Sequence, residues 1–138
     1  MADKNKREEK PEFTLLHAVF RLSAETYCAT ANAPKPMRLT ICRKLHDLTD
    51  YIVDLTDAGN ELDLFDYYKE RQNAFATVEE CMKKYKRRLE VATKCRCLSL
   101  GDQKVLFQMV GEIDNKIQRL KSSDVRRYEA FVKTGTRK

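Results

Sequence analysis

The architecture of this chain is most evident in residues 37–59, which read MRLTICRKLHDLTDYIVDLTDAG. Apolar side chains recur there at alternating steps of four and three residues. This spacing predicts an amphipathic helix, because such side chains share one helical face. They are Ile41, Leu45, Leu48, Ile52 and Leu55. An acidic set is displaced from them by two residues, or about 200° around a helix, and consists of Asp47, Asp50, Asp54, Asp57 and Glu61. We therefore expect one buried face and one acidic face toward solvent.

Three further segments show helical periodicity. We expect helices over 13–32 and 62–98, and a last helix that begins after Ser99. Pro34 and Pro36 separate the first helix from the second, since proline lacks a backbone donor and disfavours helix in the residue before it. Ser99 is expected to be the N-cap of the last helix. Short connections between four amphipathic helices favour an all-α, antiparallel up-down-up-down four-helix bundle.

The length of 138 residues is that of a single domain. We divide it into a disordered N-terminal arm (1–12), with Pro11 as a stop, the four-helix bundle (13–122) and a basic C-terminal extension (123–138). No stretch approaches the roughly 18 consecutive apolar residues that a membrane span needs, and the N-terminus has no apolar signal segment. We therefore expect a cytoplasmic protein with no membrane partner.

Two features leave alternatives open. Arg71 interrupts the apolar positions of the third helix, so it either pairs with a carboxylate inside the bundle or extends to a lateral edge. The segment 122–124, Ser-Ser-Asp, indicates a break or a frayed end, although residues 124–132 retain helical spacing and could continue the last helix.

The sequence contains no recognisable catalytic or metal-binding motif. Its 4 glycines do not form a phosphate-binding loop, and its 5 cysteines and 2 histidines lack the spacing of a zinc site. Cys28 or Cys42 near His46 could form a nucleophile pair, and the acidic face of 37–59 could hold a hard cation. The plainer interpretations are free thiols and a solvated helix face. We expect no enzyme activity, no cofactor and no metal.

Positive charge is concentrated in the second half of the chain. Residues 70–138 hold 17 Lys and Arg against 9 Asp and Glu, whereas residues 1–69 hold 10 against 12. Such a surface attracts phosphates by releasing their counterions. Alternatives are an ordinary solvated face and pairing with acidic residues of neighbouring subunits. The candidate nucleic-acid contacts are Lys83, Lys84, Lys86, Arg87, Arg88, Lys94, Arg96, Lys104, Lys116 and Arg119.

Two stretches resemble a known family. The segment 34–41, PKPMRLTI, resembles the P-K-x-x-R-x-T-L segment that opens the second helix of small four-helix-bundle proteins. Leu98-Ser99, followed by Gln103, Leu106 and Glu112-Ile113, resembles their last helix. The family comprises the accessory variability determinant (Avd) proteins of diversity-generating retroelements and relatives encoded in intervening sequences of large-subunit ribosomal RNA genes.

The resemblance carries specific expectations. It implies a ring-like homopentamer of four-helix protomers. For the Avd branch it implies a non-catalytic protein that binds a reverse transcriptase and RNA or an RNA/DNA hybrid, and so supports mutagenic cDNA synthesis. The basic residues above are then RNA or transcriptase contacts, and Pro34, Lys35 and Arg38 are fold or subunit contacts. Arg71 is a further expected fold or subunit contact, on its position in the third helix and not on the resemblance. The intervening-sequence branch implies instead a structural or interaction bundle with no nucleic-acid role.

Overall fold

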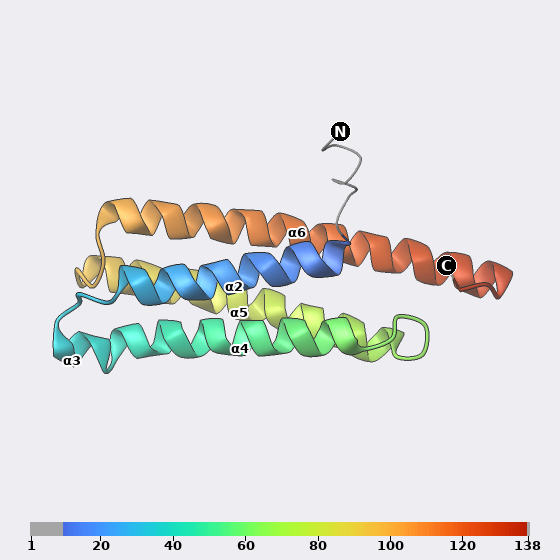
Figure 1. Ribbon diagram of the computed structural model, residues 1–138, viewed down its shortest axis with the longest axis horizontal. Coiled ribbons are helices and arrows are strands. Elements are labelled where there is room, and N and C mark those ends of the chain that lie inside the picture. Colours follow the sequence, from blue (N-terminus) through green and yellow to red (C-terminus); the bar gives the residue numbers. More distant parts are fainter. Residues whose placement is uncertain (1–9, 138) are drawn as a thin grey trace, which may run out of the picture.

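The computed structural model describes residues 10–137, which form four long helices and one short helix (Figure 1). In chain order these are α2 (Pro11–Ala29), α3 (Lys35–Arg38), α4 (Ile41–Glu61), α5 (Tyr68–Lys94) and α6 (Leu100–Thr134). Consecutive long helices run in opposite directions, and residues 10–137 contain no strand. The predicted all-α, up-down-up-down four-helix bundle is thus confirmed. None of the described helices is long and apolar enough to cross a membrane.

Each long helix packs on two others. Helix α2 lies against α4 and α6, and α5 lies against the same two helices, so that α2 and α5 are diagonal to each other. The α4/α5 face and the α2/α6 face are therefore opposite sides of the bundle. This arrangement decides which basic side chains can act together.

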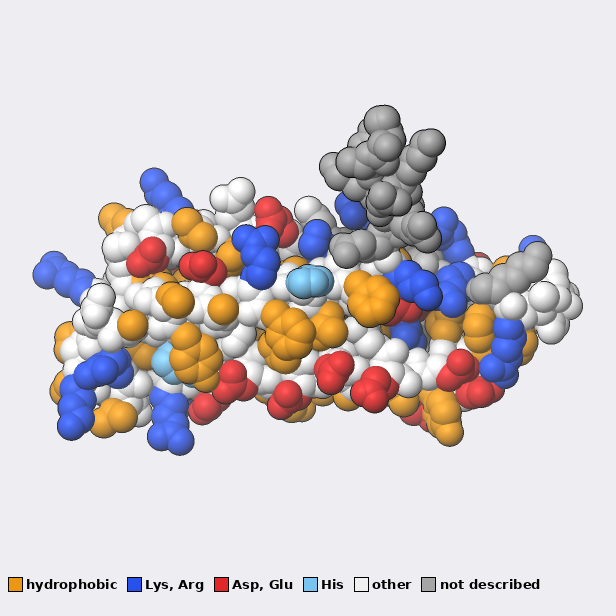
Figure 2. All heavy atoms as spheres, viewed as in Figure 1, with side chains coloured by type: hydrophobic (Ala, Val, Ile, Leu, Met, Phe, Trp, Pro, Cys, Tyr) orange, Lys and Arg blue, Asp and Glu red, His pale blue; other side chains and the backbone are white. Residues whose placement is uncertain are grey.

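The interior is built from the predicted periodic positions. On α4, Leu45 and Ile52 are fully buried, and Leu48 is partly buried. The acidic set of α4 is exposed throughout, and Figure 2 shows it as a row of acidic side chains along the lower edge of the molecule. Burial of each large apolar side chain contributes about 1.5–3 kcal/mol, so the two-faced character of α4 sets its orientation.

A polar contact crosses the core between the diagonal helices. The Thr26 hydroxyl lies 2.7 Å from the Tyr85 hydroxyl and also donates to the Leu22 carbonyl at 2.6 Å. Tyr85 is fully buried, and this burial raises its pKa to about 12. The phenol therefore remains neutral and satisfied inside the bundle, as buried polar groups must be.

Arg71 is buried at the far end of the bundle from α3, where it joins several segments. Its Nε donates to Asp124 Oδ2 at 2.7 Å and its Nη2 to Asp124 Oδ1 at 3.1 Å. Nη2 also donates to Glu12 Oε2 at 3.0 Å, and Nη1 to the Leu62 carbonyl at 3.2 Å. Of the two alternatives for Arg71, the structure has the carboxylate pair inside the bundle, and it ties α2, α5 and α6 together.

The first helix begins earlier than expected. Pro11 is its first residue rather than a stop, so the expectation of a disordered arm is wrong for residues 11 and 12. Proline suits the first helical position because its fixed φ is helical and its missing N–H would be unpaired there anyway. Residues 1–9 of the predicted arm lie outside the described residues.

The second and third helices are both shorter than predicted. Residues Lys35–Arg38 form the one-turn helix α3 with Pro34 as its N-cap, and α4 starts only at Ile41. Residues 62–67 form a turn instead of helix, because the Asp63 carboxylate accepts the backbone N–H groups of Phe65 at 2.9 Å and Asp66 at 2.7 Å. Side-chain bonds of this kind compete with helix formation.

Helix α6 is continuous over 35 residues. Ser99 is its N-cap, as predicted, and accepts the Asp102 N–H at 3.0 Å. The predicted break at 122–124 is wrong, because Asp124 faces inward to Arg71. The segment expected as a C-terminal extension is therefore helical to Thr134, with Tyr128 stacked on Tyr68 at 3.9 Å between ring centroids.

Candidate nucleic-acid interface

The basic residues of α5 are divided by the helix periodicity. Phe75, Met82 and Leu89 face the core and fix the rotation of the helix. The cations between these positions therefore leave the helix in different directions. Some point toward α4, some toward α6 and some directly into solvent. The predicted basic residues therefore do not form one continuous surface.

Four cations meet in an open groove between α4 and α5, which we call the α4/α5 groove. Its volume is about 520 Å³, and it is lined by Lys44, Asp47, Leu48, Lys84, Arg87, Arg88 and Val91. Lys84, Arg87 and Arg88 come from α5, and Lys44 comes from α4. Four positive charges thus face one carboxylate, Asp47, over an apolar floor.

The four cations of this groove have no ion-pair partner within residues 10–137. All four side chains are exposed. Like charges held on adjacent helices repel one another, so a phosphate-bearing ligand that neutralises them is favoured electrostatically. The groove therefore has the charge and the openness that a phosphate backbone requires.

Two predicted contacts already have acidic neighbours. Lys86 turns toward α6, where its Nζ lies 3.4 Å from Asp114 Oδ2. The Lys83 Nζ lies 3.6 Å from Glu80 Oε2 on the same helix. Both pairs are substantially exposed, and such pairs contribute about 0–1 kcal/mol. They reduce the free charge of α5 on the side away from the α4/α5 groove.

Three more predicted contacts lie where α5 turns into α6. Lys94 is the last residue of α5, Arg96 lies in the turn and Lys104 lies in the second turn of α6; all three are exposed. Arg96 has a φ of 62°, with the Cys97 N–H bonded to the Ala92 carbonyl at 2.9 Å. This turn and α3 occupy the same end of the bundle (Figure 1), and Figure 2 shows Lys and Arg side chains gathered at that end. These cations extend the positive field beyond the groove.

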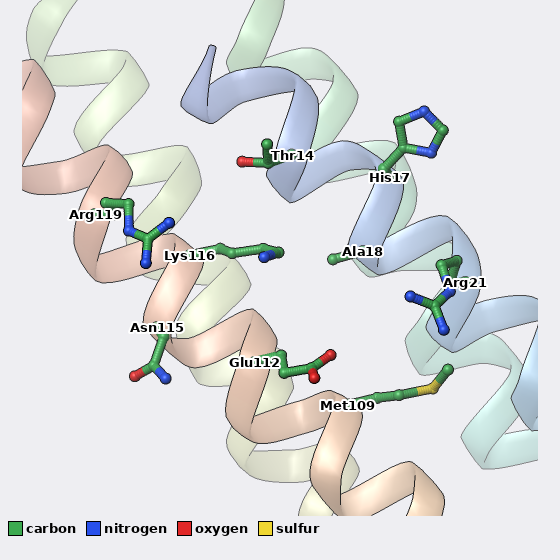
Figure 3. Close-up of a pocket in the computed structure, with 9 residues that line it drawn as sticks. All are labelled: Thr14, His17, Ala18, Arg21, Met109, Glu112, Asn115, Lys116 and Arg119. Atoms are coloured by element: carbon green, nitrogen blue, oxygen red, sulfur yellow. The ribbon is translucent and has the colours of Figure 1, made fainter. Parts of the chain in front are cut away.

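Lys116 and Arg119 do not join this surface. They line a groove between α2 and α6, on the opposite face of the bundle, together with Arg21 (Figure 3). The ten predicted contacts therefore divide between two faces. Lys44 and Arg21 were not among the predicted contacts. Their basic character is visible in the sequence, but their position beside other cations depends on which helices are neighbours.

The residues predicted as fold or subunit contacts have different surroundings. The Pro34 carbonyl accepts the N–H groups of Met37 and Arg38, both at 2.9 Å, and so starts α3. The side chains of Lys35 and Arg38 are exposed. Arg71 is a contact within the protomer, as described above.

The thiol and imidazole groups do not form an activated pair at Cys42. Burial raises the pKa of the Cys42 thiol to about 11, with the neighbouring Cys97 adding to the effect. A nucleophilic cysteine needs the opposite shift, since the thiolate is the reactive form. His46 Nε2 lies 2.8 Å from the Thr30 hydroxyl, and its ring stacks on Tyr27 at 4.1 Å. Burial lowers the pKa of His46, against the nearby carboxylates Asp50 and Asp47.

The acidic face of α4 has no ligand geometry. In the part of the chain that the structure describes, no three His, Cys, Asp or Glu side chains are grouped so that they could hold a metal ion. Its carboxylates are spread along an exposed helix, as expected for a solvated face.

Comparison of the chain with known protein families and with curated proteins finds no match.

Proposed function

We propose that this protein is a non-catalytic accessory protein that binds the phosphate backbone of RNA, or of an RNA/DNA hybrid, through the α4/α5 groove. The observation that carries the proposal is the meeting of Lys44, Lys84, Arg87 and Arg88 in one groove with a single opposing carboxylate. Cations of neighbouring helices converge there without an ion-pair partner in the described chain. The packing of the bundle does not use these four charges, because all four side chains are exposed.

Binding through this groove is electrostatic and indifferent to sequence. None of the described residues that line the α4/α5 groove is aromatic, so these residues offer no platform on which bases could stack. Lys and Arg contacts to phosphates position a strand but do not read its bases. We therefore expect similar affinity for different single-stranded sequences and a steep dependence on salt.

The partner enzyme follows from the family resemblance of residues 34–41 and of the start of α6. On that basis we propose that the protein acts in the cytoplasm with the reverse transcriptase of a diversity-generating retroelement, and that it supports mutagenic cDNA synthesis. In the homopentamer that the resemblance implies, five copies of the groove would add their weak contacts through effective concentration. A reverse transcriptase gene and a variable repeat beside this gene would support this role.

A second candidate function is a protein-interaction bundle of the intervening-sequence type. The exposed acidic face of α4 favours it, together with exposed aromatic side chains on the adjacent α2, namely Phe20 and Tyr27. This candidate predicts little affinity for RNA at about physiological salt. A location of the gene within a ribosomal RNA operon would also support it.

The two candidates are separated by RNA binding of a groove variant. In Lys84→Gln/Arg87→Gln/Arg88→Gln, three phosphate contacts are lost. Each contact on a single strand contributes about 0.7 to the slope of log K against log salt. The variant is expected to reduce that slope by about 2, and to lower affinity by about 50-fold at roughly 0.15 M salt. Fluorescence anisotropy of a labelled single-stranded RNA over roughly 50–200 mM salt measures both.

The matched control removes the same charge elsewhere. Lys69, Arg126 and Lys133 are exposed residues toward the other end of the bundle, so Lys69→Gln/Arg126→Gln/Lys133→Gln has the same net charge as the groove variant. It should retain nearly the wild-type affinity. Equal losses in both variants would mean that net charge, and not the groove, accounts for binding. Light scattering coupled to chromatography, with and without RNA, reports the number of subunits in the same samples.

A further inference from the structure

The second cationic groove lies between α2 and α6, and we call it the α2/α6 groove. Its volume is about 420 Å³. Arg21 enters it from α2, and Lys116 and Arg119 enter it from α6 (Figure 3). Glu112 is the acidic side chain among the residues that line it. The groove therefore holds three cations against one carboxylate, as a separate site from the α4/α5 groove.

The three cations are arranged in a row along the groove. Figure 3 shows Arg119 near Thr14, Lys116 extending across toward Ala18, and Arg21 beside Glu112 and Met109. Because α2 and α6 are antiparallel, these are three successive levels along the helices. Adjacent levels are about one helical turn, or roughly 5 Å, apart. A row of cations suits an extended chain of phosphates better than it suits one isolated anion.

These cations are also available. Arg21, Lys116 and Arg119 form no ion pair with any residue of the described range 10–137. Two of the three are guanidinium groups, whose planar donors match phosphate oxygens in a bidentate manner. A phosphate backbone laid along the groove would meet each cation in turn.

We propose that the α2/α6 groove is a second binding site for a nucleic-acid phosphate backbone, so that one protomer holds two separate strand segments on opposite faces. This inference rests on the proposed function, because it assigns a second site to the same class of ligand. The bundle is two helix layers thick between the two grooves. With the usual interhelical spacing of 8–10 Å and the side chains that project beyond it, the grooves are about 20 Å apart. A short oligonucleotide can therefore fill one groove without reaching the other.

Stoichiometry tests the proposal independently of the oligomeric state. Titration of the wild-type protein with a short single-stranded RNA, followed by calorimetry, should give two strands per protomer. Arg21→Gln/Lys116→Gln/Arg119→Gln should bind one strand, and so should the α4/α5 groove variant. If the Arg21/Lys116/Arg119 variant retains the wild-type stoichiometry, the second site is refuted. If only the α4/α5 variant retains it, the second site stands and the proposed role of the α4/α5 groove fails.

A gain of affinity cannot result from misfolding, so Glu112→Gln is the complementary variant. It removes the opposing carboxylate and adds one net positive charge to the groove. The expected result is about fourfold tighter binding of the second strand at roughly 0.15 M salt, which corresponds to one further phosphate contact. Unchanged or weaker binding of that strand would overturn the proposal.

Protection of lysines in the wild-type protein identifies the occupant directly. Saturating RNA should slow acetylation of Lys116 and of Lys84 several-fold, as measured by mass spectrometry, while the exposed Lys69 reacts at its original rate. Free ATP at the same phosphate concentration should protect Lys116 much less, since it spans fewer levels of the row. Protection of Lys116 by ATP but not by RNA would refute a backbone site.

Discussion

The buried pair of Arg71 and Asp124 offers the sharpest test of how this bundle is held together. Arg71 is 2% exposed and Asp124 is 4% exposed. Arg71→Met leaves the Asp124 carboxylate buried without its guanidinium, and this should cost about 3–5 kcal/mol of the free energy of unfolding. Asp124→Leu removes the two hydrogen bonds at 2.7 and 3.1 Å but leaves Arg71 bonded to Glu12 and to the Leu62 carbonyl. We expect a cost of about 3 kcal/mol for it.

The double variant separates the pair from its surroundings. Arg71→Met/Asp124→Leu replaces both charges with apolar groups of similar size, so it should cost only about 0–2 kcal/mol. With these single and double costs, the coupling energy is about 4 kcal/mol or more. Urea denaturation followed by circular dichroism measures all three free energies. Domains of this size are stable by about 5–15 kcal/mol, so the single variants should unfold at distinctly lower urea concentrations.

An exposed pair provides the control. Arg137 pairs with Asp63 and Asp66 on the surface, and its side chain is 48% exposed. Arg137→Met should leave the urea midpoint nearly unchanged, because exposed ion pairs contribute little to stability. A stabilising role of the Arg71–Asp124 pair is refuted if replacing Arg71 costs no more than replacing Arg137, or if the costs of Arg71→Met and Asp124→Leu are simply additive.

Three further predictions concern local features of the helices. Gly59→Ala places a Cβ 3.0 Å from Phe75 Cζ and should destabilise the protein by about 1 kcal/mol or more. Gly111→Ala meets nothing within 4 Å and should stabilise the protein by about 0.5–1 kcal/mol. Thermal denaturation measures both, and shifts of the same sign would contradict this prediction. Ser99→Ala removes the N-cap bond of α6 and should cost about 1 kcal/mol in urea denaturation, and an unchanged midpoint would count against the cap. Burial lowers the pKa of His46, so the unfolded chain takes up a proton first as pH falls below about 6.5, and stability drops until the lower folded-state pKa is passed. His46→Gln should lack this part of the pH dependence of stability. If its stability varied with pH in the same way as that of the wild type, His46 would not be the group responsible.

The candidate site was only partly predictable from the sequence. The cations of α5 were evident as a run of Lys and Arg between core positions. Their division was not evident, because Lys86 turns to Asp114 whereas Arg88 turns to the α4/α5 groove. Lys44 and Arg21 line the grooves only because α4 packs beside α5 and α2 packs beside α6. Such neighbours are distant in the sequence, and a single sequence does not state the order in which helices pack.

Two helix boundaries show the same limit. Asp63 delays the start of the third helix, which was predicted from residue 62 but begins at Tyr68, because its carboxylate bonds backbone groups of its own turn. This effect is local, but it competes with an apolar pattern that continues through the turn. At Asp124 the opposite occurs. A polar Ser-Ser-Asp segment that resembles a helix end stays helical, because the carboxylate finds Arg71 on another helix.

The amino-acid sequence by itself determined the four long helices, their two-faced character and the N-cap of α6. These depend on the spacing of apolar side chains over a few turns and on hydrogen bonds between residues three apart, which are local properties of the chain. Only the tertiary structure decided that Arg71 is neutralised by Asp124, that α6 runs unbroken to Thr134, and that the basic side chains form two grooves on opposite faces. The physical reason is that charge and burial act between side chains that the packing of helices brings together, irrespective of their separation along the sequence.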